Sequence, residues 1–200
     1  MNHELGFVGE VSTFYTGPLT ADERAFIDRI TQKQQERDGD SKRVSEVVVS
    51  KDGHREDVFG DSPELKRLSD LADFALYQYV TKAFPEMERM DIEIRRVGCW
   101  LNIGKVGKEL HTHDSDFSVV FYLDDTEGED GHTVMTNPVN PHLNCGSGLI
   151  QQHFRRGLRI KPVEGNVLIF PGYMEHAVEP YTGNTPRRTF GIDYTAFDSK

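Results

Sequence analysis

The chain has 200 residues, of which 36% are hydrophobic and 10% aromatic, and its formal net charge is -10. This length and apolar content are enough for one compact domain over 1–200, and the acidic balance argues against binding to a nucleic-acid backbone, which needs a basic surface. No run approaches the roughly 18 apolar residues of a membrane span, and 1–11 lack the layout of a signal peptide. We therefore expect a cytoplasmic protein without nucleic-acid or membrane partners.

The N-terminal part, 1–90, is expected to be mainly helical after a short entry strand within 7–16. Thr20 and Glu23 have the spacing of a capping box and predict a helix that ends in the polar run 32–43. The sequence VSEVVVS at 44–50 predicts a short strand.

A second helix is predicted to begin with Ser62 as N-cap and Pro63 at the first helical position. Apolar side chains recur at helical spacing after it, at Leu65, Leu68, Ala72, Leu76, Tyr79 and Ala83. An amphipathic helix of this length is typical of one that packs against a sheet.

Residues 91–197 are expected to form a strand-rich core, because short segments rich in Ile, Val, Phe and Tyr alternate with turns. These segments are 91–103, 116–124, 131–136, 158–163, 166–171, 175–181 and 187–195. Helices followed by strands predict a mainly β fold with supporting helices. The run 137–157 is too long and too rich in Gly, Pro and Asn for a hairpin turn, so we expect a lid there.

Two histidines with metal-ligand spacing, His111 and His113, lie in the segment GKELHTHDSDFSVVFYLDD. On an extended strand, residues two apart place their side chains on the same face. A third candidate, His176, follows the buried strand and turn of EGNVLIFPGYMEHAVEP. The two cysteines, Cys99 and Cys145, have no metal-finger spacing and are interpreted as thiols in a reducing compartment.

Residues 98–195 resemble the iron(II)- and 2-oxoglutarate-dependent oxygenase superfamily, in particular the branch of small oxygenases whose first metal motif is His-x-His. The resemblance rests on four elements in order, namely WLN with a glycine-containing loop, HTHDSDFSVVFYL, IKPVEGNVLIFPGYMEH, and an arginine after them. It implies a double-stranded β-helix, a cupin-like jelly roll buttressed by the N-terminal helices. It also implies Fe(II) as cofactor and 2-oxoglutarate as co-substrate. Three facial protein ligands leave positions for a chelating 2-oxo acid and for O2.

The middle metal ligand departs from the common His-x-Asp or His-x-Glu pattern of the superfamily, because position 113 is a histidine. Three arrangements remain open. The iron is held by His111, His113 and His176, or Asp114 or Asp116 takes the place of His113, or the middle ligand is absent.

The far carboxylate of a 2-oxo acid needs a cation, and arginine can pair with it bidentately. If Phe190, Ile192 and Tyr194 pack under the helices, strand alternation turns Arg188 with them and Arg187 toward the cavity, so Arg187 is the predicted anchor. Arg188 is then interpreted as a solvated charge guarding a strand edge. Alternation and the family resemblance together add Tyr122, and Asn102 is a further candidate for contact with the oxo acid.

An anionic substrate could be held by Arg155, Arg156 and Arg159 under the predicted lid. The predicted function is a 2-oxoglutarate-dependent dioxygenase that hydroxylates a small molecule or peptide and releases succinate and CO2. The alternatives are a cupin-type metal dioxygenase or isomerase that needs no 2-oxo acid, and a catalytically silent binding module on the same barrel. The sequence leaves the substrate and the oligomeric state open.

Overall fold

The computed structural model describes residues 11–38, 45–51, 59, 62–136 and 157–198. Its elements are β1 (Ser12–Tyr15), α1 (Ala21–Asp38), β2 (Ser45–Lys51), α3 (Lys66–Ala83), the 3-10 helix η1 (Pro85–Arg89), β3 (Ile92–Ile103), β4 (Lys108–His111), β5 (Phe117–Tyr122), β6 (Thr133–Thr136), β7 (Gly157–Ile160), β8 (Asn166–Pro171), β9 (His176–Val178) and β10 (Arg188–Asp198). No helix among these residues is long and apolar enough to cross a membrane.

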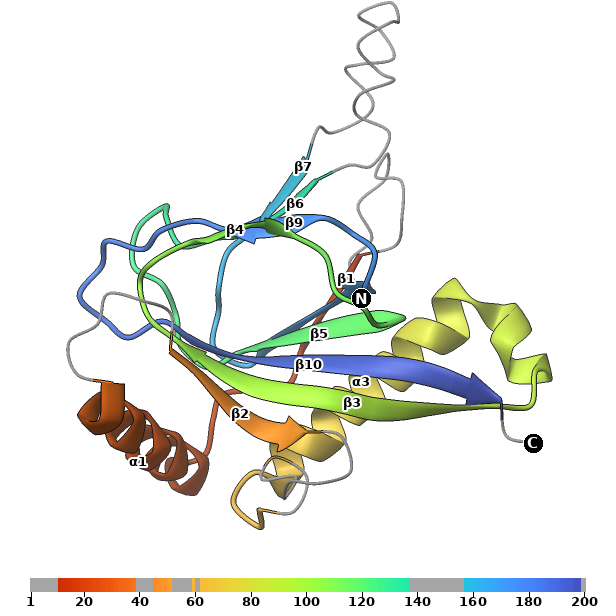
Figure 1. The fold of residues 1–200 in the computed structure, drawn as a ribbon, viewed down its shortest axis with the longest axis horizontal. Helices are drawn as coiled ribbons and strands as arrows, with labels where there is room; N and C mark the ends of the chain where they lie inside the picture. Colours follow the sequence, from red (N-terminus) through yellow and green to blue (C-terminus); the bar gives the residue numbers. More distant parts are fainter. Residues whose placement is uncertain (1–10, 39–44, 52–58, 60–61, 137–156, 199–200) are drawn as a thin grey trace, which may run out of the picture.

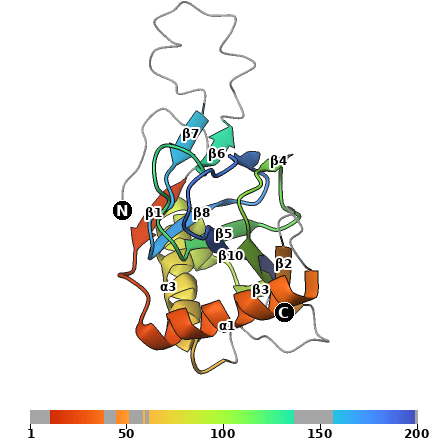
Figure 2. The same ribbon diagram turned by 90° about the vertical axis from the view of Figure 1, so that its left-hand side faces the viewer.

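Two antiparallel sheets form the core of the molecule (Figure 1). The larger sheet has the strand order β1-β8-β5-β10-β3-β2, and the smaller has the order β4-β9-β6-β7. Figure 2 shows α1 and α3 on the side of the larger sheet that faces away from the smaller one. This arrangement confirms the predicted double-stranded β-helix with helices supporting one face.

Helix α1 begins with the predicted capping box. The backbone N–H of Glu23 donates to Thr20 Oγ1 at 3.3 Å, and the Glu23 carboxylate accepts from the Thr20 backbone N–H at 2.7 Å. The last helical residue of α1 is Asp38, so the helix ends within the polar run 32–43, as predicted. The Gln, Glu and Arg residues of that run have high helix propensity, and a hydrogen bond from Gln32 to Glu36 supports the last turns of the helix.

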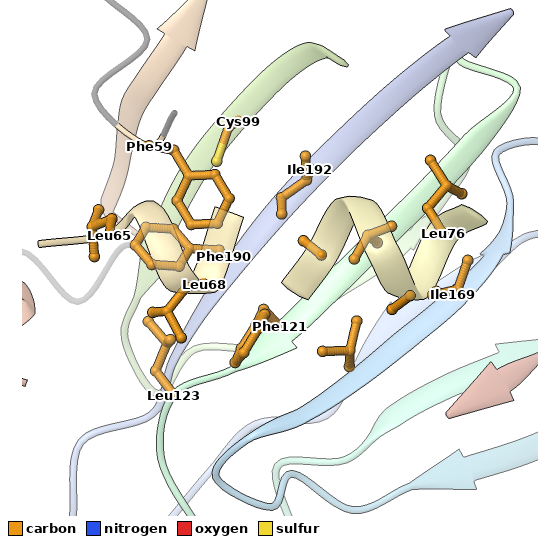
Figure 3. Close-up of a cluster of buried hydrophobic side chains, with 14 of the residues drawn as sticks. Phe59, Leu65, Leu68, Leu76, Cys99, Phe121, Leu123, Ile169, Phe190 and Ile192 are labelled. Carbon is orange, nitrogen blue, oxygen red and sulfur yellow. The ribbon is translucent and has the colours of Figure 1, made fainter. Parts of the chain in front are cut away.

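Helix α3 begins later than predicted. Ser62 is not its N-cap, because its hydroxyl donates to the carboxylate of Glu64, and 62–65 form a turn before the helix begins at Lys66. The predicted apolar face is confirmed for Leu68 and Leu76. Figure 3 shows both side chains pointing toward the larger sheet.

The main core lies between α3 and the larger sheet, where β10 contributes Phe190 and Ile192 and β5 contributes Phe121 (Figure 3). Each large apolar side chain buried here contributes about 1.5–3 kcal/mol to folding. Because strand residues alternate, this packing turns the other face of β10 toward the space between the sheets. At one end that space is filled by a second apolar cluster that includes Met135, Phe170 and Met174.

Candidate metal centre

The three predicted histidines meet between the two sheets. His111 is the last residue of β4 and pairs across the ladder with His176, the first residue of β9. His113 lies beyond the end of β4, so it does not reach the site by strand alternation as the sequence prediction assumed. Its backbone N–H instead donates to the carbonyl of Gly172 at 2.9 Å, which ties this loop to the end of β8.

One ligand nitrogen from each histidine lies within 4.8 Å of those of the other two. The Nδ1 atoms all lie near groups that only accept hydrogen bonds. For His111 this is the carbonyl of Glu109 at 2.7 Å, and for His176 it is the carbonyl of Met174 at 3.1 Å. In His113 it is the carboxylate of Asp193 at 3.0 Å. Each Nδ1 therefore carries the proton in the neutral ring, and the lone pair that can bind a metal is on Nε2.

A cation fits this arrangement. The Nε2 atoms of His113 and His176 are 3.3 Å apart, and with both protons on Nδ1 this contact sets one lone pair against another. A positive ion shared by the imidazoles relieves that repulsion. Burial lowers the pKa of His176 to about 4, with His111, His113 and Lys108 lowering it further and the hydrogen bond to Met174 opposing them. His176 is therefore neutral at pH 7, as a metal ligand must be.

Asp114 and Asp116, the alternative middle ligands, are both exposed. One carboxylate oxygen of Asp116 accepts from the backbone N–H of Ala196 at 2.8 Å. Among the described residues, neither carboxylate joins the cluster formed by the three histidines. The geometry therefore brings together the three-histidine set.

A pocket opens beside the histidines. Its walls come from β3, β4, β5, β6, β9 and β10, and they include Trp100, Asn102, Lys108, Ser118, Thr133, Arg187, Thr189, Gly191 and Asp193. Sequence reasoning missed Trp100, Lys108 and Ser118 as pocket residues. Asp193 is six residues after Arg187, so the strand alternation that turns Arg187 toward the cavity also turns Asp193 there, although the sequence alone indicates no role for it.

Arg187 is 7% exposed and lines this pocket, as predicted. Its Nε donates to the carbonyl of Gly131 at 2.9 Å. Within the described part of the chain no carboxylate forms an ion pair with it, and burial lowers the pKa of its guanidinium, with the nearby Tyr122 opposing the shift. A buried cation without an anionic partner in the protein is suited to bind the carboxylate of a ligand.

Arg188 lies on the opposite face of β10, as alternation predicted, but it is not a solvated edge charge. It is 4% exposed and forms two hydrogen bonds to the carboxylate of Asp124, both 2.8 Å long. A third, 2.5 Å long, reaches Asp28 on α1. Arg188 therefore serves to bind α1 to the sheet.

Tyr122 is fully buried, and its hydroxyl donates to Thr133 Oγ1 at 2.8 Å. It lies on the face of β5 opposite Phe121, as predicted, and Thr133 is the member of this pair that lines the pocket. Asn102 also lines the pocket, and its amide group donates to Thr189 Oγ1 at 3.3 Å.

The predicted substrate contacts fall mostly outside the part of the chain that the structure describes. Arg155, Arg156 and nearly all of the lid segment 137–157 are in that group. Arg159 is exposed on β7, where its guanidinium pairs with both carboxylate oxygens of Glu179 at 2.9 and 2.8 Å. It does not line the pocket beside the histidines.

Residues 98–193 match the model of the family described as "Putative 2OG-Fe(II) oxygenase". These residues belong to the 2-oxoglutarate/iron(II) oxygenase superfamily. They include the three histidines, Arg187, and Asp193, whose carboxylate lies beside Nδ1 of His113. The chain therefore carries the core of a 2-oxoglutarate-dependent oxygenase, whose cofactor is Fe(II) and whose co-substrate is 2-oxoglutarate. No curated protein matches its sequence.

Solved structures show the same fold for the oxygenase as a whole. AviO1 from Streptomyces viridochromogenes has a TM-score of 0.59 at 15% identity, over 95% of this chain and 90% of its own. HygX from Streptomyces hygroscopicus, crystallised with nickel and 2-oxoglutarate, has a TM-score of 0.55 at 14% identity. The match covers 96% of this chain and 82% of HygX. A Pseudomonas putida prolyl-4-hydroxylase has a TM-score of 0.55 at 12% identity, and the match covers 94% of this chain and 93% of the hydroxylase.

Proposed function

We propose that His111, His113 and His176 bind the iron(II) of this oxygenase through their Nε2 atoms. The observation that carries this proposal is the shared pattern of Nδ1 contacts, which puts the lone pair of each neutral ring on Nε2, in three rings whose ligand nitrogens lie within 4.8 Å of one another. The neutral state of His176 supports it. When bound, the metal together with 2-oxoglutarate and O2 supplies the oxidising chemistry, with succinate and CO2 as by-products.

Arg187 is the proposed anchor of the distal carboxylate of 2-oxoglutarate. Its Nε is held by the carbonyl of Gly131, which fixes the plane of the guanidinium in the pocket. Tyr122 and Asn102 are proposed to assist by shaping this end of the pocket. Tyr122 orients Thr133 through its hydroxyl, and Asn102 orients Thr189.

The proposed reaction is hydroxylation of a small molecule or a peptide. The prolyl-4-hydroxylase with this fold supports it, whereas two other structures with this fold are named as a carbocyclase and an epimerase from nogalamycin biosynthesis. The mass of the product discriminates between these outcomes, since hydroxylation adds one oxygen atom. The cytoplasmic location and the lack of nucleic-acid partners stay predictions from the composition.

The decisive experiment measures 2-oxoglutarate binding to the Fe(II)-loaded protein without O2. Binding is expected to produce a weak visible charge-transfer band, and Arg187→Gln is expected to weaken 2-oxoglutarate affinity by a factor of about 30 or more, the equivalent of losing a buried charge pair. The matched control is Arg95→Gln on the same sheet, because Arg95 is exposed and pairs with Glu93 outside the pocket.

Three results would contradict the proposal. If the three-histidine protein binds Fe(II) but Arg187→Gln binds 2-oxoglutarate as tightly as Arg95→Gln, then Arg187 is not the anchor. If the protein oxidises a substrate with O2 while no 2-oxoglutarate is consumed, it is a cupin-type dioxygenase. A chain that binds both ligands and never forms succinate with any substrate is a silent binding module.

A further inference from the structure

His113 differs from the other two histidines in how its ring is held. His111 and His176 each place Nδ1 against a backbone carbonyl two residues earlier in the chain. His113 places Nδ1 3.0 Å from a side-chain carboxylate that lies 80 residues away in the sequence, that of Asp193. Its ring also stacks on Trp100, with 5.6 Å between ring centroids and 11° between planes.

Asp193 is held in place by the larger sheet. It lies directly opposite Ser118 in the β10–β5 ladder, so both side chains lie on the pocket face. Ser118 Oγ donates to Asp193 Oδ1 at 2.8 Å, which leaves Oδ2 for His113. The register of β10 against β3 shifts immediately after Asp193, and such irregularities are common beside active sites, where they redirect a side chain.

The charge of Asp193 is unbalanced in the protein alone. Its side chain is 15% exposed, and within the described ranges the only basic side chain at ion-pair distance is His113, whose imidazole brings no charge when it is neutral. Three neutral imidazoles bring no negative charge to iron(II), whereas the common superfamily motif brings one carboxylate. A carboxylate that accepts the Nδ1 proton of a ligand histidine fixes the tautomer and makes Nε2 a stronger donor.

We infer that Asp193, oriented by Ser118, is a positioning residue that supplies this missing carboxylate from behind His113. It directs Nε2 of His113 toward the metal. It also places a negative charge near the metal, on the far side of the His113 imidazole ring. The inference rests on the proposed function, because it requires His113 to be a ligand. It adds a Ser118–Asp193–His113 chain to the three-histidine centre.

The test is Co(II) binding to the full-length protein, followed by calorimetry and by the visible d–d spectrum of the bound ion. Asp193→Asn keeps the shape and removes the charge, and we expect a 10- to 100-fold loss of Co(II) affinity together with a changed d–d spectrum. Ser118→Ala keeps the carboxylate of Asp193 but removes the hydrogen bond that orients it, and we expect about a fivefold loss of Co(II) affinity. The matched control is Asp114→Asn, an exposed aspartate next to His113, whose affinity and spectrum should stay those of the parent.

His113→Ala separates this inference from the proposal on which it rests. If His113→Ala loses Co(II) affinity while Asp193→Asn and Ser118→Ala behave like Asp114→Asn, the ligand set stands and the role of Asp193 is wrong. Equal losses in Asp193→Asn and Asp114→Asn would also overturn it, since the effect would then be general electrostatics. If His113→Ala binds Co(II) as the parent does, the three-histidine centre itself is wrong. Thermal unfolding of each metal-free variant shows whether its fold is retained.

Discussion

Arg187 and Arg188 are neighbours in the sequence at the start of β10, yet their side chains lie on opposite sides of the larger sheet and in opposite electrostatic surroundings. Both are buried, but Arg188 pairs with two aspartates, whereas Arg187 hydrogen-bonds only to a carbonyl among the described residues. A buried cation whose anions come from the protein holds elements together. A buried cation without one is positioned for an anion from outside, and here it lies in the same pocket as the three histidines.

The largest expected effect on stability is at Arg188. Arg188→Ala leaves Asp124, itself 8% exposed, without its main partner, and we expect the free energy of unfolding to fall by about 3–5 kcal/mol. Arg187→Ala removes a charge that has no protein counter-ion and should change stability far less. Denaturant unfolding of both variants tests this comparison. Similar losses in the two would show that Arg187 is also structural.

Gly191 tests how tightly the pocket face is built. A Cβ at this position would lie 2.7 Å from Nε1 of Trp100, the side chain that stacks on His113. Gly191→Ala is therefore expected to cost about 1–3 kcal/mol and to weaken metal binding as the indole moves. Gly98→Ala is the control, since its nearest Trp100 atom is at 3.4 Å. Equal metal affinities in the two variants would contradict the role given to Trp100.

The helix face carries a pH-sensitive contact at Glu23, which pairs with Arg67 on α3 through two hydrogen bonds of 2.7 Å. Burial alone would raise the pKa of Glu23, but the hydrogen bonds from Arg67 and Thr20 outweigh it and leave the pKa below its ordinary value of 4.5. The contact therefore stabilises the fold above pH 4.5 and is lost as the pH falls through the lower folded-state value. Glu23→Gln should cost about 1–3 kcal/mol at pH 7.

Unfolding experiments across the acid range check this sign. The difference in unfolding free energy between the parent and Glu23→Gln should shrink below pH 4.5. A difference that stays constant down to pH 2 would mean that the charge of Glu23 contributes nothing.

The smallest expected effect is at Tyr122, on the pocket side. Tyr122→Phe removes the hydrogen bond to Thr133, with an expected cost of about 1 kcal/mol. Burial raises the pKa of Tyr122 to about 12, despite the opposing hydrogen bond and Arg187, so its hydroxyl stays protonated from pH 6 to 9. The ratio of 2-oxoglutarate affinities between parent and variant should accordingly be the same throughout that range. Isothermal titration at several pH values measures this ratio.

Local sequence patterns were sufficient for much of the fold. The strand predicted at 166–171 has those bounds in β8, and the capping box at Thr20 and Glu23 forms as expected. Alternation along β10 also separated Arg187 from Arg188, because a strand fixes its two faces once one of them is known to be apolar. The start of α3 was missed, because the hydroxyl of Ser62 hydrogen-bonds to the nearby carboxylate of Glu64 and the helix begins only at Lys66.

The sequence by itself determined the residue types of the site, namely three histidines and an arginine in the order typical of the superfamily. Only the tertiary structure decided what each of them contacts. Asp193 reaches His113 across 80 residues, and Arg188 reaches Asp28 across 160. Such contacts depend on which strands become neighbours, and this is decided by packing of the two sheets and the helices together. The sequence therefore established that the metal motif lacks its carboxylate, and the fold placed a carboxylate behind His113.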